Sequence, residues 1–274
     1  MNEQIPVSHV RLGVRGISLS FGGVTALEGV NVEVRGNEIL SVIGPNGAGK
    51  TSLLNCICGF YKPEKGSIHF EGNDVTYLPP HKRAELGIAR TFQGIQLYPG
   101  MSVLDNILSG RHIRMKTNII QNAFYWIWAR REEAEHRVVV EEIINFLEMG
   151  SIRTKIVAEL SYGLRKRVDL GRALALEPKI LIMDEPVAGM NIDEKEEFSQ
   201  LILNIRERRR IPMVLVEHDM GMVMDISDRI VVLDWGMVIA EGSPGQIKED
   251  PKVIMAYLGE DREKKNHAQS NEVV

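Results

Sequence analysis

The sequence predicts an α/β fold with a parallel-sheet core, an N-terminal antiparallel β portion and an inserted helical subdomain. Apolar runs of strand length occur at Ile180–Met183, Met213–Val216 and Ile230–Leu233. A helical stretch from Lys195 to about Arg208 separates the first two runs, which is the arrangement of a βαβ crossover and therefore of parallel strands. Between residues 95 and 177 strand signals give way to helical spacing, which predicts the insertion.

The N-terminal elements follow from apolar runs and turn residues. The stretch from Val10 to Glu38 alternates short apolar strands with glycines, which predicts antiparallel β-structure. The compact apolar run Glu38–Ile43 predicts a buried strand, and a helix should follow from Lys50 to about Cys58, closed by the next glycine. A further strand is expected at Ser67–Glu71, with a turn at residues 72–74.

The composition argues against two classes of protein. The 274 residues carry a net charge of −4 with a sequence pI near 6.0, whereas general nucleic-acid binders usually show a basic excess. No apolar run approaches the roughly 18 residues of a membrane-spanning helix, and Met1–Gln4 lack the pattern of a signal peptide. We therefore expect no nucleic-acid partner and a cytoplasmic location, with only peripheral membrane contact.

The sulfur-containing side chains are expected to serve packing. Cys56 and Cys58 lie two apart on a predicted helix, so they should point to different faces. The sequence offers no second Cys or His pair that would complete a metal site with them. Met220, Met222 and Met224 are expected to fill gaps in the core, as flexible thioether chains commonly do.

Residues 44–51 have the P-loop spacing G-x-x-x-x-G-K-[ST], between a predicted strand and a predicted helix. Glycines let backbone N–H groups approach phosphate oxygens, and the helix N-terminus adds its positive dipole end. Lys50 would supply a charge for the β- and γ-phosphates, and Thr51 a hydroxyl for Mg²⁺. These features predict a P-loop NTPase (RecA-like) core that takes a nucleoside triphosphate and Mg²⁺. The expected nucleotide contacts are Gly44, Pro45, Asn46, Gly47, Ala48, Gly49, Lys50, Thr51 and Ser52.

A second motif is the apolar strand Ile180–Met183, which ends in Asp184 and Glu185. Alone this is a weak signal, because a solvated strand end has the same pattern. In a chain with a P-loop, Asp184 is the expected oxygen ligand of Mg²⁺ at the carboxyl edge of the sheet. Glu185 is then the carboxylate expected to polarise the attacking water.

The segment Leu160-Ser161-Tyr162-Gly163-Leu164 resembles the signature motif of ABC ATPases, usually Leu-Ser-Gly-Gly-Gln, in its usual place before the acidic strand. Ser161 is a good N-cap, so a capped helix without further function is the alternative. The resemblance implies that Ser161 and Gly163 bind the γ-phosphate held by a second subunit. Leu164 departs from the usual Gln, which puts the contact made by that Gln in doubt.

Three further positions match the same family. Phe21 resembles the aromatic residue that stacks on adenine, although a lone Phe near a strand is usually a core residue. Gln93, after Arg90-Thr91-Phe92, resembles the residue that contacts Mg²⁺ and the lytic water. His218, after the strand Met213–Val216, resembles the switch histidine at the γ-phosphate, whereas a lone His is ordinarily a bystander.

The resemblance covers about residues 10–259 and extends to a subgroup, the ATPases that serve bacterial importers of branched-chain and other hydrophobic amino acids. Asn191 stands where many ABC proteins have Asp, and this subgroup often has Asn there. Such systems imply a second ATPase subunit, the same or paralogous, two integral membrane permeases and a periplasmic or surface substrate-binding protein. The further residues that carry this resemblance are Tyr162, Ala188–Asn191, Glu217–Met220, Ile226–Arg229 and Ile254–Gly259.

These motifs predict one ABC ATPase domain over residues 8–262. Its nucleotide-binding core would comprise residues 8–94 and 178–262, and its helical subdomain residues 95–177, followed by a polar tail at 263–274. The expected activity is ATP hydrolysis coupled to import, at the cytoplasmic face of the membrane. An export or lipid-transport ATPase remains open, since the same core serves both directions. An ABC ATPase acting on DNA or the ribosome is less compatible with a single P-loop and a single signature.

One aromatic run leaves two interpretations open. Five consecutive apolar side chains cannot all face one side of a helix. Packing within the helical insertion is the first interpretation. Contact with the membrane subunit or lipid headgroups is the second, because Trp and Tyr beside Arg suit such a boundary. The run is Phe124, Tyr125, Trp126, Ile127 and Trp128, followed by Ala129, Arg130 and Arg131.

Overall fold

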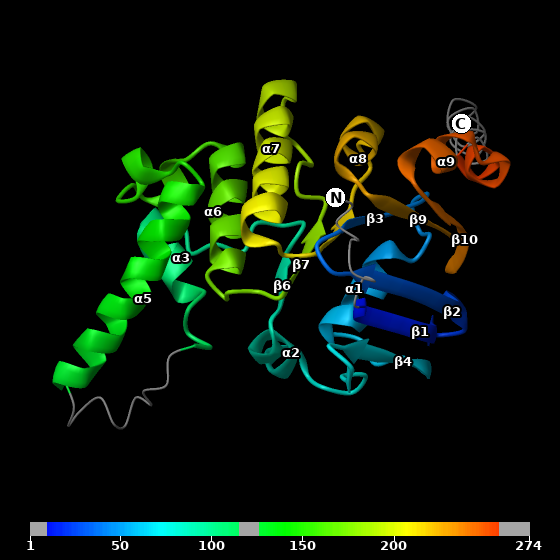
Figure 1. Cartoon of the computed structure of the whole chain (residues 1–274), viewed down its shortest axis with the longest axis horizontal. Helices are drawn as coiled ribbons and strands as arrows, with labels where there is room; N and C mark the ends of the chain where they lie inside the picture. The colour runs from blue at the N-terminus through cyan, green and yellow to red at the C-terminus, as the bar shows by residue number, and fades with distance from the viewer. Residues whose placement is uncertain (1–9, 115–125, 258–274) are drawn as a thin grey trace, which may run out of the picture. The chain divides into compact units, whose positions relative to one another are not determined.

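The computed structural model describes residues 10–114 and 126–257, with the side chains of residues 126–132 left out of the description (Figure 1). The chain divides into two compact units. The first comprises the described residues up to Pro80 and from Arg206 onward, and the second comprises His81–Ile205. No helix among the described residues is both long enough and apolar enough to cross a membrane.

The first unit contains an antiparallel sheet in the strand order β2-β1-β4-β5. Gly22 and Gly23 connect the first two strands and both have positive φ, 53° and 88°. Such residues form the tight hairpin turns that match the twist of a sheet. The inward positions of the long strands are apolar, and the outward positions are exposed. The strands are β1 (Val10–Phe21), β2 (Val24–Arg35), β4 (Lys65–Phe70) and β5 (Asn73–Asp74).

The same unit contains four further strands in the order β10-β9-β3-β8. β3 (Ile39–Ile43) and β8 (Met213–Val216) are buried along their whole length, and they pair in parallel. β3 also pairs in parallel with β9 (Arg229–Asp234), which pairs antiparallel with β10 (Met237–Gly242). The helices of this unit are α1 (Lys50–Cys58), α8 (Met220–Ile226), α9 (Pro244–Glu249) and residues 251–257.

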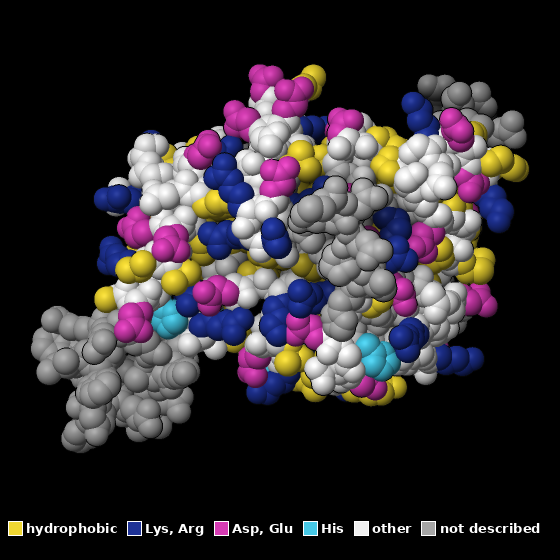
Figure 2. All heavy atoms as spheres, in the orientation of Figure 1, with side chains coloured by type: hydrophobic (Ala, Val, Ile, Leu, Met, Phe, Trp, Pro, Cys, Tyr) yellow, Lys and Arg dark blue, Asp and Glu magenta, His cyan; other side chains and the backbone are white. Residues whose placement is uncertain are grey.

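The second unit combines a parallel strand pair with a helical layer. β6 (Ile88–Thr91) pairs with β7 (Ile180–Asp184). Three helices of this unit pack against one another, as Figure 1 shows: α3 (Val103–Ser109), α5 (Trp126–Phe146) and α6 (Tyr162–Leu174). On the face drawn in Figure 2, acidic and basic side chains are interspersed over these helices. The remaining elements are α2 (Pro80–Leu86), η1 (Gly150–Ile152), η2 (Val157–Glu159) and α7 (Ile192–Arg209), the last of which continues past the unit boundary.

Most of the predicted elements are confirmed. The N-terminal antiparallel portion, the parallel pairing of strands and the helical character of the insertion are all present. The helix predicted at Lys50 to about Cys58 is α1, closed by Gly59 in the left-handed conformation. Both cysteines are buried, which confirms their packing role.

The structure also differs from the predictions in several places, and three of them have a clear local explanation or a small shift. Strand β6 was not predicted, because a run of four residues that contains an arginine gives little apolar signal. Helix α7 begins three residues before Lys195, since Asn191 closes a reciprocal cap with Glu194. The turn after β4 lies at residues 71–72, one position earlier than expected.

Some predictions concern residues outside the description. Phe124, Tyr125 and the polar tail at 263–274 lie outside the described residues. Residues 126–128 begin α5, but their side chains are not described, so both interpretations of the aromatic run stay open. The limits 95–177 of the helical subdomain also stay a prediction, and the compact unit that contains it is larger.

Candidate functional site

The P-loop joins β3 to α1, and its glycines occupy conformations that other residues rarely adopt. Gly44, Gly47 and Gly49 have φ values of 149°, 78° and 101°. A Cβ atom on Gly44 would lie 2.0 Å from the backbone oxygen of Leu233, and one on Gly49 would lie 2.6 Å from that of Ala26. The close backbone packing therefore requires glycine at both ends of the loop.

Lys50 lies inside this loop. Its side-chain nitrogen donates to the carbonyl oxygens of Gly44 at 2.7 Å and Pro45 at 2.9 Å, and the residue is 7% exposed. Within α1, a fully described helix, no acidic residue occupies the first turn and Gly49 offers no side-chain cap. The N-terminal amides and the ammonium thus favour an anion. Thr51 is exposed and Ser52 half-buried in the same turn.

His218 follows β8, which is the neighbour of β3 in the parallel sheet. Both the P-loop and His218 therefore leave the sheet at the carboxyl ends of adjacent strands. His218 is exposed, whereas Glu217 is 3% exposed. The Glu217 carboxylate accepts from the backbone N–H of His218 at 2.9 Å, and Asp219 caps α8 by accepting from Met222 N at 3.1 Å. These bonds fix the backbone on both sides of the histidine.

Phe21 is not a core residue. It is 47% exposed at the end of β1, so the alternative that this residue packs in the core is wrong. Its ring meets that of Tyr61 edge to face, with centroids 5.1 Å apart and an interplanar angle of 69°. Such a pair leaves aromatic surface open to a further flat ring. Tyr61 was not predicted, although it follows the exposed Phe60 directly after α1.

In the second unit, the acidic strand end has defined partners. The Asp184 carboxylate, with a side-chain exposure of 5%, forms an ion pair with Arg90 at 2.7 Å. Arg90 comes from β6, the strand that was not predicted. Glu185 has a φ of 48°, and its carboxylate accepts from Gln93 Nε2 at 2.7 Å. The structure thus brings together two of the three predicted catalytic residues.

The signature segment opens α6. Ser161 is its N-cap, with the N–H of Leu164 donating to its hydroxyl at 3.4 Å. A Cβ on Gly163 would lie 2.7 Å from the Glu194 carboxylate, so a side chain here would displace that group. Glu194 itself accepts from Asn191 N at 3.1 Å and donates its own N–H to the Asn191 side chain at 2.9 Å. Asn at position 191 is therefore explained as the N-cap of α7.

A buried cation beside this site was not predicted. Lys166 of α6 is 4% exposed and donates to the backbone oxygens of Gln93 and Glu185. The only signal in the sequence is the three-residue spacing from Lys166 to Asp169 and from Asp169 to Arg172, which places three charged side chains on one helix face. Such a face is ordinarily solvated, so the signal is easily dismissed.

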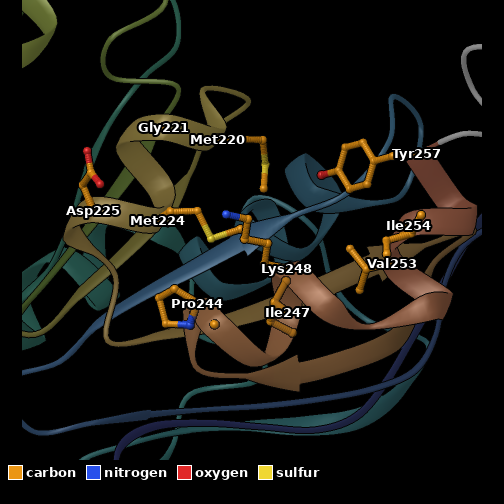
Figure 3. A pocket seen from close by; sticks show the side chains of 11 residues that line it. Met220, Gly221, Met224, Asp225, Pro244, Ile247, Lys248, Val253, Ile254 and Tyr257 are labelled. Carbon is orange, nitrogen blue, oxygen red and sulfur yellow. The ribbon is translucent and has the colours of Figure 1, made fainter.

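A separate pocket of about 590 Å³ lies in the first unit, between α8, α9 and residues 251–257 (Figure 3). Its lining is mostly apolar, and the Asp225 carboxylate points away from the other labelled side chains. Of the three methionines, Met222 is buried at 6% exposure, whereas Met220 and Met224 are partly buried, pack against the core and also line this pocket. An apolar lining does not suit a polyphosphate, which distinguishes this pocket from the P-loop.

The chain matches two family models. The model described as "ABC transporter" covers residues 27–188, and the model described as "Branched-chain amino acid ATP-binding cassette transporter" covers residues 237–263. The first match spans more than half of the chain, and it includes the P-loop, the signature segment and the acidic strand end.

Individual proteins give the same result. The chain is 39% identical to the "High-affinity branched-chain amino acid transport ATP-binding protein BraF" of Pseudomonas aeruginosa, over 91% of this chain and 98% of that protein. It is 39% identical to the corresponding protein LivG of Escherichia coli (strain K12), over 93% of this chain and 100% of that protein. A crystal structure of the ADP conformation of an ABC transporter's ATP-binding cassette is 34% identical, with a TM-score of 0.81, over 92% of this chain and 100% of that one.

The geometry and the comparisons agree on a nucleotide-binding protein. A loop with glycine at both ends precedes α1 and encloses the side chain of Lys50. A capped signature helix and an acidic strand end occur in the second unit. These features lie within the matched range, and the relatives match along nearly their whole length. The chain therefore belongs to the ABC transporter family, as one of its ATP-binding ATPase subunits.

Proposed function

We propose that the chain hydrolyses ATP to drive import of branched-chain or other hydrophobic amino acids. The observation that carries the ATPase part is the P-loop, in which Lys50 is enclosed by backbone carbonyls below an uncapped helix N-terminus. The match of residues 237–263 to the branched-chain amino acid cassette model supports the transport part. The printed names of the relatives BraF and LivG support it as well.

In this proposal each predicted residue has a defined role. The P-loop amides and Lys50 hold the β- and γ-phosphates. Glu185 orients the attacking water. Gln93 contacts that water, and His218 contacts the γ-phosphate. Phe21 stacks on adenine, which fits its exposed ring. Mg²⁺, held by Thr51, Gln93 and Asp184, would neutralise charge on the phosphates.

Asp184 fits a metal-ligand role in its chemistry. It is a hard carboxylate donor at the carboxyl end of a buried strand, where such ligands are found in nucleotide-binding sheets. In the structure its carboxylate is paired with Arg90, which keeps a buried charge compensated. We propose that one carboxylate oxygen remains bonded to Arg90 while the other faces the metal.

The proposed assembly is a head-to-tail dimer beneath two permeases. Ser161 and Gly163 would contact the γ-phosphate bound to the partner ATPase subunit, the same or paralogous, in a closed two-fold arrangement. Dimer closure on ATP and reopening after hydrolysis would drive the permeases, which receive amino acids from a periplasmic or surface binding protein. The chain would then work peripherally at the cytoplasmic face of the membrane.

An uptake assay tests the transport part directly. Cells lacking the chain should lose uptake of radiolabelled leucine and regain it with the natural chain but not with Glu185→Gln. Lysine uptake serves as the control for general energisation and should stay unchanged. Normal leucine uptake in the deletion strain, with another transported class lost instead, would contradict amino-acid import while leaving the ATPase assignment intact.

A further inference from the structure

Helix α6 presents three charged residues on one face, at positions 166, 169 and 172. Lys166 and Asp169 are 4% and 2% exposed, which is rare for charged side chains unless they are well paired. Lys166 donates to Gln93 O at 2.8 Å and to Glu185 O at 3.3 Å. One buried ammonium thus bonds the backbone of both predicted catalytic residues of this unit.

The other two residues hold the same loop. Arg172 donates to the backbone oxygen of Gln96 and pairs with Asp169 at 2.8 Å. Asp169 also accepts from the backbone N–H of Phe92. Burial raises the pKa of Asp169, and the charges of Arg172 and Lys166 and these hydrogen bonds oppose the rise. The segment from Phe92 to Gln96 is therefore attached to α6 at three points.

The bonded residues are also bonded to each other. The Gln93 amide donates to the Glu185 carboxylate at 2.7 Å, which aligns the two side chains. Glu185 has a φ of 48°, a left-handed conformation that is costly for a residue with a side chain. Such a conformation persists only where the surroundings impose it, and the Lys166 bond to the Glu185 carbonyl is one of those restraints.

Lys166 also reaches back toward the signature. Its ammonium lies 5.8 Å from the centroid of the Tyr162 ring, within the range of a cation–π contact. Tyr162 is the first residue of α6, directly after the Ser161 cap. A shift of the signature turn would therefore also displace the ammonium group that bonds Gln93 and Glu185.

We propose that Lys166 is a positioning residue, which couples the signature end of α6 to the orientation of Gln93 and Glu185. In this role it acts through its bonds to the backbone of Gln93 and Glu185, rather than by contact with the nucleotide or the water. This inference rests on the proposed roles of Gln93 and Glu185. Lys166→Met keeps most of the length and the apolar stem of the side chain and removes the charged donor group.

The steady-state ATPase rate tests the proposal. Lys166→Met should lower kcat at least about tenfold, because small misplacements of catalytic groups have large effects on rate. Its ATP affinity should stay within about twofold, since the P-loop is untouched, and Lys166→Arg should restore most of the rate. The matched control is Arg167→Met on the same helix, which removes an ion pair with Glu197 at 2.8 Å and should leave kcat unchanged.

The remaining outcomes each decide the matter. An unchanged kcat in Lys166→Met, an equal loss in Arg167→Met, or no rescue by Lys166→Arg would overturn the positioning role. If Lys166→Met does not fold, Lys166→Gln takes its place, and unfolding of both would assign Lys166 to stability alone. Glu185→Gln, measured in parallel, separates the proposed role of Glu185 from that of Lys166. If Glu185→Gln retains full turnover, the proposed function of Glu185 is wrong whatever the result for Lys166.

Discussion

The P-loop and the cluster of Gln93, Glu185 and Lys166 are built in opposite ways. The P-loop is one contiguous segment whose shape comes from glycine backbones, packed against the carbonyls of Ala26 and Leu233. The cluster brings together residues 93, 166 and 185, which lie far apart in the sequence, through side-chain bonds. The P-loop has no room for a Cβ atom at Gly44 or Gly49, whereas the side-chain cluster depends on individual donors and charges.

Because of this difference, we expect the P-loop to control nucleotide affinity and the cluster to control the rate of turnover. Changes in the P-loop should act on nucleotide affinity, because the phosphates depend on its amides and on Lys50. Changes in the cluster should act on turnover, because its members orient a carboxylate rather than hold the nucleotide. The next three predictions each test one side of this division.

The largest effect is expected for Lys50→Ala. Two charge-assisted bonds to phosphate at roughly 1.5–3 kcal/mol each would be lost, so ATP affinity should fall on the order of a thousandfold. Titration with a fluorescent ATP analogue measures this. Lys65→Ala, which removes an exposed lysine of β4 in the same unit, is the control and should bind normally. Equal ATP affinity in both variants would contradict the role of the P-loop in ATP binding.

Glu185→Gln should show the reverse pattern. Its amide oxygen can still accept from Gln93, so the local geometry persists while the carboxylate charge is lost. Turnover should fall at least about a hundredfold, the lower range for loss of a general base, with ATP affinity retained. Phosphate release and nucleotide titration on one preparation give both numbers. Retained turnover would mean that another group activates the water.

The smallest effect is expected for Phe21→Ala. An aromatic stacking contact contributes about 0.5–1.5 kcal/mol, so ATP affinity should weaken roughly threefold to tenfold with kcat unchanged. Phe21→Trp should retain affinity, and Val24→Ala, at a residue 70% exposed in the next strand, is the control. If GTP and ATP affinities fall alike in Phe21→Ala, stacking is general for purines; no change for either would leave the Phe21–Tyr61 pair without a role in binding.

The same division explains what the sequence could predict. The P-loop, α1 and the capped signature helix depend on residues close in the sequence, so spacing and turn chemistry suffice to place them. The Arg90–Asp184 pair depends on β6 lying beside β7, and no local sequence pattern predicts that pairing. Lys166 was missed for the same reason, since its acceptors are backbone oxygens of loops that are remote in the sequence.

The central claim is that the signature of one subunit completes the nucleotide site of another. Ser161→Arg would place a bulky cation at the N-terminus of α6 and should block dimer closure without harming ATP binding to one subunit. Size-exclusion chromatography of Glu185→Gln, with and without Ser161→Arg, measures this in the presence and absence of ATP and Mg²⁺. The account predicts a dimer only for Glu185→Gln alone with nucleotide. A dimer that persists in the double variant, or forms equally well without nucleotide, would contradict it.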